Sequence, residues 1–130
     1  WARGFTGPVL APGDSADRPM LGSLRQARLL HQPLGVTQAH FKRALATQPI
    51  TVPAGTFGAD VCTVTATAGR TWTFWVETSE PHRILQWQCS DGERARLLGS
   101  DRLAYWTLNA PGGEQSLARL GLTARPPRTP

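Results

Sequence analysis

Three titratable residues lie close together near the middle of the sequence: Glu77, Glu80 and His82. A histidine beside a carboxylate can act as a general base in catalysis. The same residue types in a polar loop more commonly form a solvated charge cluster. The sequence also contains no phosphate-binding loop, no dinucleotide fingerprint and no Gly-x-Ser-x-Gly motif. We therefore predict that the chain is not an enzyme.

Residues that bind metals are present but dispersed. His31, His40 and His82 are far apart in the sequence, and neither Cys62 nor Cys89 belongs to a CxxC pair. The sequence therefore predicts no metal site and no cofactor. An oxidising compartment would allow one disulfide. In a consecutive meander, however, the cysteines would lie two strands apart, about 10 Å from each other and out of bonding reach without a bulge, a bend or another strand order. Two buried free thiols are the alternative.

The most suggestive chemistry is aromatic. Six aromatic residues are concentrated in one part of the chain: Trp72, Phe74, Trp75, Trp87, Tyr105 and Trp106. One interpretation is that they form the core of a small sheet covered by a C-terminal helix, because aromatic side chains dominate core energetics. The functional interpretation is a curved sheet whose concave face binds an acyl chain or another hydrophobic ligand. Trp72, Phe74, Trp87 and Trp106 are then the predicted ligand-binding residues. A platform for stacking sugars is a third interpretation.

Two segments, 71–77 and 84–89, position most of these rings. Both alternate in residue type with the period of two that is typical of a half-buried antiparallel strand. Trp72 and Phe74 therefore share one face, and Trp75 lies on the other. One face cannot hold all the tryptophans, so at least one is exposed, covered by another element or used at an interface. We assign Trp75 to a partner contact.

Turn signals and β-branched residues predict further strands around this pair. Residues 49–57 are expected to form a hairpin with a Pro-Ala-Gly turn, and residues 60–67 to form a strand. The Asp91-Gly92 pair is a strong turn signal, because Gly accepts the positive φ of tight hairpins. Residues 94–98 continue the meander. Residues 102–108 form either a last strand or an irregular segment that covers the sheet.

Helical segments are few and short. Residues 21–31 predict a short helix with Ser23 as its N-cap, although a strand is an alternative. Residues 37–47 are equally ambiguous and also fit a strand. Residues 114–120 predict a short C-terminal helix, with Gly121 where a helix C-cap requires it.

The chain is most simply a single domain with two extensions. Residues 1–20 are rich in Pro and Gly and predict an extended N-terminal arm, in which Trp1 and Phe5 are candidate partner contacts. Residues 21–122 form the antiparallel β domain. Residues 123–130 are a Pro-rich tail.

Composition excludes some functions. The net charge is +5, but the basic residues are scattered, whereas proteins that bind nucleic acids usually concentrate them on one helix or groove. We expect no nucleic-acid partner. No apolar run approaches the roughly 20 residues that cross a bilayer, so we expect no transmembrane segment. The chain begins with Trp1, not Met, which indicates a processed or excerpted chain and gives weak support to export.

Residues 49–122 resemble the DUF3108-like family of bacterial exported proteins, which is related in architecture to the lipoprotein-carrier half-barrels. The resemblance rests on the Val-Pro-Ala-Gly-Thr-Phe hairpin at 52–57, the aromatic strand at 72–76, and Gln86-Trp87. It implies a strongly curved antiparallel sheet in the bacterial envelope. It supplies no catalytic residues.

Together these features predict a mainly β protein: a single curved antiparallel meander, half-barrel-like, with a short C-terminal helix and an extended N-terminal arm. The predicted function is non-catalytic binding of a lipid or hydrophobic ligand on the aromatic face, in the periplasm or otherwise exported. The alternative is an extrinsic accessory subunit of a larger envelope or membrane-associated complex, in contact with other protein subunits.

Overall fold

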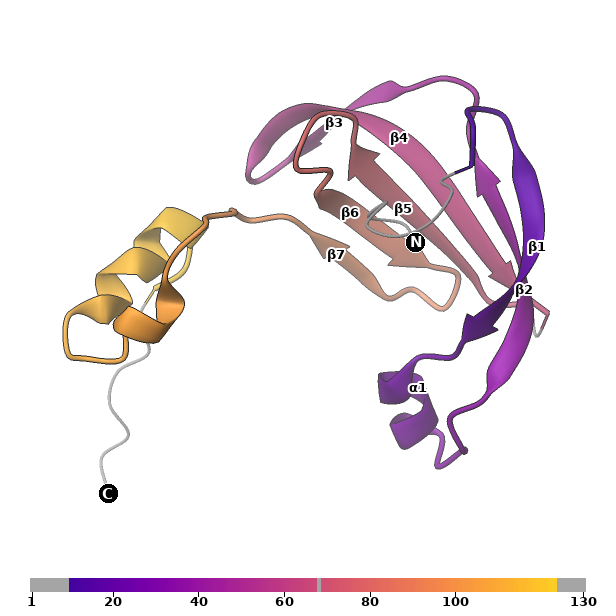
Figure 1. Cartoon of the computed structure of the whole chain (residues 1–130), viewed down its shortest axis with the longest axis horizontal. Helices are drawn as coiled ribbons and strands as arrows, with labels where there is room; N and C mark the ends of the chain where they lie inside the picture. Colours follow the sequence, from indigo (N-terminus) through magenta and orange to yellow (C-terminus); the bar gives the residue numbers. More distant parts are fainter. Residues whose placement is uncertain (1–9, 68, 124–130) are drawn as a thin grey trace.

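The computed structural model describes residues 10–67 and 69–123, and these form one curved, open, antiparallel sheet with little helix (Figure 1). The strands are β1 (Ser15–Leu21), β2 (Val36–Arg43), β3 (Gln48–Val52), β4 (Gly55–Ala66), β5 (Thr71–Glu77), β6 (Ile84–Cys89) and β7 (Arg94–Arg96). Their order is β1-β2-β4-β5-β6-β7, with β3 paired to β4 alone. The predicted fold class is confirmed.

Strand β4 departs from a simple meander because two strands share one of its edges. β2 pairs with its C-terminal half, where Phe41 lies opposite Val64. β3 pairs with its N-terminal half, where Ile50 lies opposite Phe57. The other edge of β4 pairs with β5 along most of its length. The 12 residues of β4 thus hold the sheet together.

The sheet carries an apolar cluster on each face. The Trp72-face cluster consists of Ala39, Phe41 and Val64, with Leu10, Met20, Trp72 and Phe74 packed against it. The Trp75-face cluster consists of Val52, Ala59 and Leu85, with Ile50, Ala54, Phe57, Trp75 and Leu97 packed against it. The predicted separation of Trp75 from Trp72 and Phe74 is confirmed.

The hairpin of β3 and β4 closes over the Trp75-face cluster. At the tip of this hairpin the backbone N–H of Ala54 donates to the carbonyl oxygen of Leu97 (3.1 Å), and Arg96 donates to the carbonyl oxygen of Thr51 (3.0 Å). These bonds attach the tip to the end of β7. Leu85 lies in this cluster with none of its surface exposed.

Both cysteines are buried and free. Cys62 lies on β4 and Cys89 on β6, with β5 between them, so the predicted two-strand separation is confirmed. Burial raises the pKa of the Cys62 thiol, and the nearby Arg43 guanidinium only partly offsets this effect. Cys62 is therefore protonated at neutral pH and behaves as a small apolar side chain.

The predicted N-terminal arm is partly a strand. Residues 15–21 pair with β2 along their whole length, and this corrects the assignment of residues 1–20 to an extended arm. Pro19 is tolerated there because β1 is an edge strand, which need not donate every backbone hydrogen bond. Trp1 and Phe5 lie outside the described residues.

The short helix expected in residues 21–31 is confirmed as α1 (Leu24–Leu29), which connects β1 to β2. Ser23 is its N-cap, and its hydroxyl accepts a hydrogen bond from the backbone N–H of Gln26 (3.3 Å). Residues 37–47, which the sequence left open, are mostly strand β2.

The C-terminal residues do not cover the sheet. Residues 98–122, here called the C-terminal unit, contain two 3-10 helices, η1 (Tyr105–Thr107) and η2 (Gly113–Leu120), and lie to one side of the sheet (Figure 1). The expectation of a covering helix, or of a last strand at 102–108, is therefore wrong. The unit is held by contacts of its own, including an ion pair of Arg119 with Asp101 (3.1 Å).

The end of η2 follows the sequence closely. Gly121 adopts a left-handed conformation with φ of 69°. The N–H of Leu122 donates to the carbonyl oxygen of Leu117 (3.0 Å), and that of Gly121 donates to Ala118 (3.1 Å). This pair of bonds is the Schellman motif that a C-cap glycine allows.

Replacing Gly113 with Ala is expected to open the C-terminal unit without unfolding the sheet. A Cβ at this position would overlap the carbonyl oxygen of Leu108, so the backbone has to shift. Overpacking of this kind costs about 1–3 kcal/mol. Limited proteolysis should cleave residues 98–122 faster in this variant, with an unchanged denaturant midpoint for the sheet.

Gly35→Ala is the matched control, because a Cβ at Gly35 meets nothing within 4 Å. Equal cleavage rates for Gly113→Ala and Gly35→Ala would contradict the close packing of Gly113 against Leu108.

Candidate functional site

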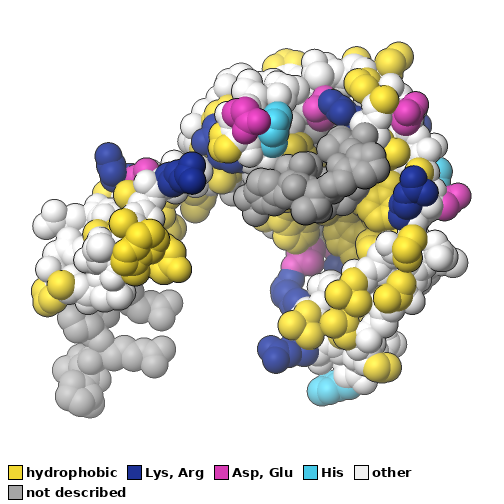
Figure 2. Space-filling model, viewed as in Figure 1, with side chains coloured by type: hydrophobic (Ala, Val, Ile, Leu, Met, Phe, Trp, Pro, Cys, Tyr) yellow, Lys and Arg dark blue, Asp and Glu magenta, His cyan; other side chains and the backbone are white. Residues whose placement is uncertain are grey.

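An apolar groove of about 330 Å³ lies on the Trp72 face. It is lined by Met20, Leu21, Ser23, Phe41, Val64, Trp72 and Phe74. Four strands, β1, β2, β4 and β5, therefore contribute to one groove. Figure 2 shows hydrophobic side chains inside the hollow between the sheet and α1.

Strand register brings these side chains together. Phe41 lies opposite Val64, and Val64 lies opposite Trp72, so the three form a row across β2, β4 and β5. Side chains on one face of neighbouring strands contact each other because directly opposed Cβ atoms are only about 5 Å apart. Trp72 and Phe74 are only half-buried, so part of each ring is left in the wall of the groove.

A charged cluster adjoins Trp72. The guanidinium of Arg70 lies 5.0 Å from the centre of the Trp72 ring, in a cation–π contact. One terminal nitrogen of Arg70 lies 2.5 Å from Asp91 and 3.4 Å from Glu93, and its Nε donates to the sulfur of Cys89 (2.8 Å). Because these contacts satisfy Arg70 on several sides, its guanidinium is held in place beside the aromatic ring.

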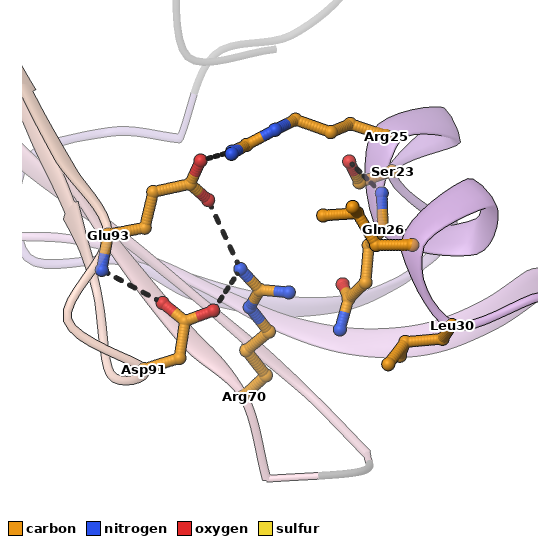
Figure 3. A pocket seen from close by; sticks show the side chains of 8 residues that line it. Ser23, Arg25, Gln26, Leu30, Arg70, Asp91 and Glu93 are labelled. Atoms are coloured by element: carbon orange, nitrogen blue, oxygen red, sulfur yellow. Dashed lines mark hydrogen bonds and ion pairs between the residues drawn. The ribbon is translucent and has the colours of Figure 1, made fainter.

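Helix α1 reaches the same cluster from the other side of the groove. Arg25 on α1 forms an ion pair with Glu93 in the turn between β6 and β7 (Figure 3). A further hollow of about 290 Å³ lies beneath α1, and both Arg70 and Trp72 line it. The apolar groove, this hollow and the charged cluster thus share lining residues and lie next to one another.

The predicted ligand-binding residues are only partly brought together. Trp72 and Phe74 line the apolar groove. Trp87 pairs with Phe74 in register but does not line the groove. Trp106 lies in η1, 66% exposed and away from the sheet, because residues 98–104 lead the chain outward. Trp75 packs against the Trp75-face cluster but stays partly exposed, and its assignment to a partner contact stays a prediction.

Sequence reasoning missed the other half of the groove. The sequence predicts an extended arm that includes Met20, and Phe41 lies in a segment, 37–47, whose pattern is ambiguous. Val64 could have been found, because Cys62, Val64 and Ala66 alternate with threonines in β4 and share a face with Trp72. The role of Arg70 beside Trp72 had no comparable signal.

The titratable cluster at the end of β5 divides into a buried residue, Glu77, and a more exposed pair, His82 and Glu80, whose Nε2 and Oε1 atoms are 3.5 Å apart. Glu77 accepts two hydrogen bonds from Arg83, each 2.7 Å long, and its side chain is only 8% exposed. These bonds hold the pKa of Glu77 below its usual value, although burial acts in the opposite direction. His82 bonds to the carbonyl oxygen of Glu77, not to its carboxylate (3.1 Å). The expectation of a solvated cluster is therefore wrong for Glu77, which is buried and fully used by Arg83.

Within residues 10–67 and 69–123, no three His, Cys, Asp or Glu side chains converge in a way that could hold a metal ion. The described helices are also all too short or too polar to cross a membrane.

Comparison of the chain with protein-family models, with curated proteins and with solved structures gave no match. The resemblance to the DUF3108-like family therefore stays a prediction.

Proposed function

We propose that this protein binds a hydrophobic ligand or lipid chain in the apolar groove of the Trp72 face, without catalysis. The observation that carries the proposal is the half-exposed pair of Trp72 and Phe74 in the wall of a groove of about 330 Å³. Small-molecule sites commonly occupy about 300–1,000 Å³ and are lined mainly by apolar and aromatic side chains.

The location of this groove on the sheet also supports the proposal. The Trp75-face cluster holds Leu85, the most deeply buried large side chain, and contributes stability from the opposite face. On the Trp72 face the rings of Trp72 and Phe74 stay partly exposed. A bound alkyl chain would cover this surface. The favourable free energy of such burial is about 25 cal/mol for each Å² of apolar area removed from water.

An envelope location is part of the proposal. It rests on the predicted resemblance of residues 49–122 to exported proteins.

Tryptophan fluorescence tests the binding function. Titration with a fatty acid or a phospholipid should give a saturable blue shift, because Trp72 would pass from a partly aqueous to an apolar environment. Trp72→Ala should weaken the affinity at least tenfold, a loss of about 1.4 kcal/mol. Trp106→Ala is the matched control and should leave the affinity unchanged, since Trp106 is not among the residues that line the groove.

Two results would contradict the proposal. One is the absence of any saturable shift with either ligand. The other is an equal loss of affinity in Trp72→Ala and Trp106→Ala, which would locate binding elsewhere.

A second candidate function is an extrinsic accessory subunit, and the C-terminal unit favours it. Tyr105 and Trp106 are exposed there, and their rings pack edge to face with their centres 5.4 Å apart. Aromatic residues are enriched at protein interfaces. This function predicts that the protein co-purifies in a large complex, that Trp106→Ser removes it from that complex, and that lipid gives no fluorescence shift.

A further inference from the structure

The apolar groove has a polar end. Ser23 and Trp72 line both the apolar groove and the hollow beneath α1, and Gln26 and Arg70 line both that hollow and a polar pocket of about 280 Å³. A molecule that lies along Trp72 therefore reaches polar side chains as soon as it passes Arg70. A purely hydrophobic ligand would leave this part of the site unused.

The polar pocket is electrically balanced. Its charged lining residues are two arginines, Arg25 and Arg70, and two carboxylates, Asp91 and Glu93 (Figure 3). The arginines come from α1 and from the connection into β5, and the carboxylates come from the turn between β6 and β7. A ligand group placed here meets both signs of charge within one pocket.

The four charges differ in how firmly they are held. Arg70 is mostly buried and contacts Asp91, Glu93, Cys89 and Trp72. Arg25 is 69% exposed, and its partner is Glu93. Exposed ion pairs contribute only about 0–1 kcal/mol. The pair of Arg25 and Glu93 can therefore open at small cost, if each partner finds a new opposite charge.

We propose that the ligand is a single-chain amphiphile with a zwitterionic head group, an inference that rests on the proposed function. The alkyl chain lies on Trp72 and Phe74. The anionic group of the head pairs with Arg25, and its cationic group pairs with Glu93. An anionic head alone would draw Arg25 away from Glu93, which would then keep only its 3.4 Å contact with Arg70. A cationic head alone would leave Arg25 without an ion-pair partner. A zwitterion satisfies both.

Three probes of equal chain length test this assignment below their micelle concentrations: lysophosphatidylcholine, a fatty acid and an alkyltrimethylammonium salt. The wild-type protein should bind lysophosphatidylcholine about tenfold more tightly than either singly charged probe. Glu93→Gln should shift the preference toward the fatty acid, and Arg25→Gln should shift it toward the alkylammonium. Ser116→Ala, in the C-terminal unit, is the control and should keep the wild-type order.

The outcomes separate the two proposals. If the three probes bind with equal affinity and neither variant changes their order, the head-group assignment is overturned, while hydrophobic binding stands. If none of the three binds, both proposals are overturned. Opposite shifts in preference in the two variants support the assignment even if each variant also weakens binding overall, because a general loss of structure would not reverse the sign.

Discussion

Arg83→Ala is expected to lower the free energy of unfolding by about 3 kcal/mol, because it leaves the Glu77 carboxylate buried without a partner. Arg83 donates both of the 2.7 Å hydrogen bonds that Glu77 accepts, and it also lies 5.1 Å from the centre of the Phe57 ring. The variant therefore loses a bidentate ion pair and a cation–π contact together. Urea denaturation followed by circular dichroism measures the effect. Exposed Arg94→Ala is the control and should stay within about 0.5 kcal/mol of wild type.

The same pair makes stability depend on pH in a defined direction. The folded-state pKa of Glu77 lies below its unfolded value, chiefly through the hydrogen bonds from Arg83. Its contribution is therefore fully present above the unfolded pKa and is lost as the pH falls through the folded pKa. Wild type should lose more stability than Arg83→Ala between about pH 5 and pH 3. Parallel curves for the two proteins over this range would contradict the role of the pair.

Leu85→Ala is expected to lower the free energy of unfolding by about 3–4 kcal/mol, within the range for truncating a fully buried leucine. None of the Leu85 surface is exposed, and its neighbours in the Trp75-face cluster come from the β3–β4 hairpin as well as from β5. A cavity there weakens the closure of that hairpin over the sheet. The denaturant midpoint should fall sharply, whereas Leu45→Ala, at a position that is 78% exposed, should leave it nearly unchanged.

Leu85→Ala also separates stability from binding. Leu85 and the apolar groove lie on opposite faces of the sheet, so the folded variant should bind ligand with wild-type affinity. A large loss of affinity at a temperature where the variant is fully folded would show that the two faces are coupled. A midpoint equal to that of Leu45→Ala would contradict the burial of Leu85.

The two faces of the sheet thus have different roles. The Trp75 face is closed by the β3–β4 hairpin and holds the fully buried Leu85. The Trp72 face carries partly exposed rings that lead to a charged cluster, and the proposed amphiphile would lie there.

Local features of this chain could be read from the sequence because their causes are local. Side chains alternate along any strand, so the separation of Trp72 and Trp75 followed from their positions alone. Ser23 caps α1, Gly92 has the positive φ of 92° expected in its turn, and Gly121 ends η2, because each depends on residues only a few positions away.

Tertiary structure alone decided which distant segments meet. Nothing in the sequence of β2 indicated that it would pair with β4 and not with β3, the next strand along the chain. The pairing of β2 with β4 completes the groove with Phe41. Arg25 and Glu93 are far apart in the chain and meet only because α1 and the β6–β7 turn lie across one hollow. Likewise, an amphipathic C-terminal helix would be expected to cover the sheet, but after β7 the chain runs away from the sheet. Such outcomes depend on the packing of the whole sheet, which no short stretch of sequence encodes.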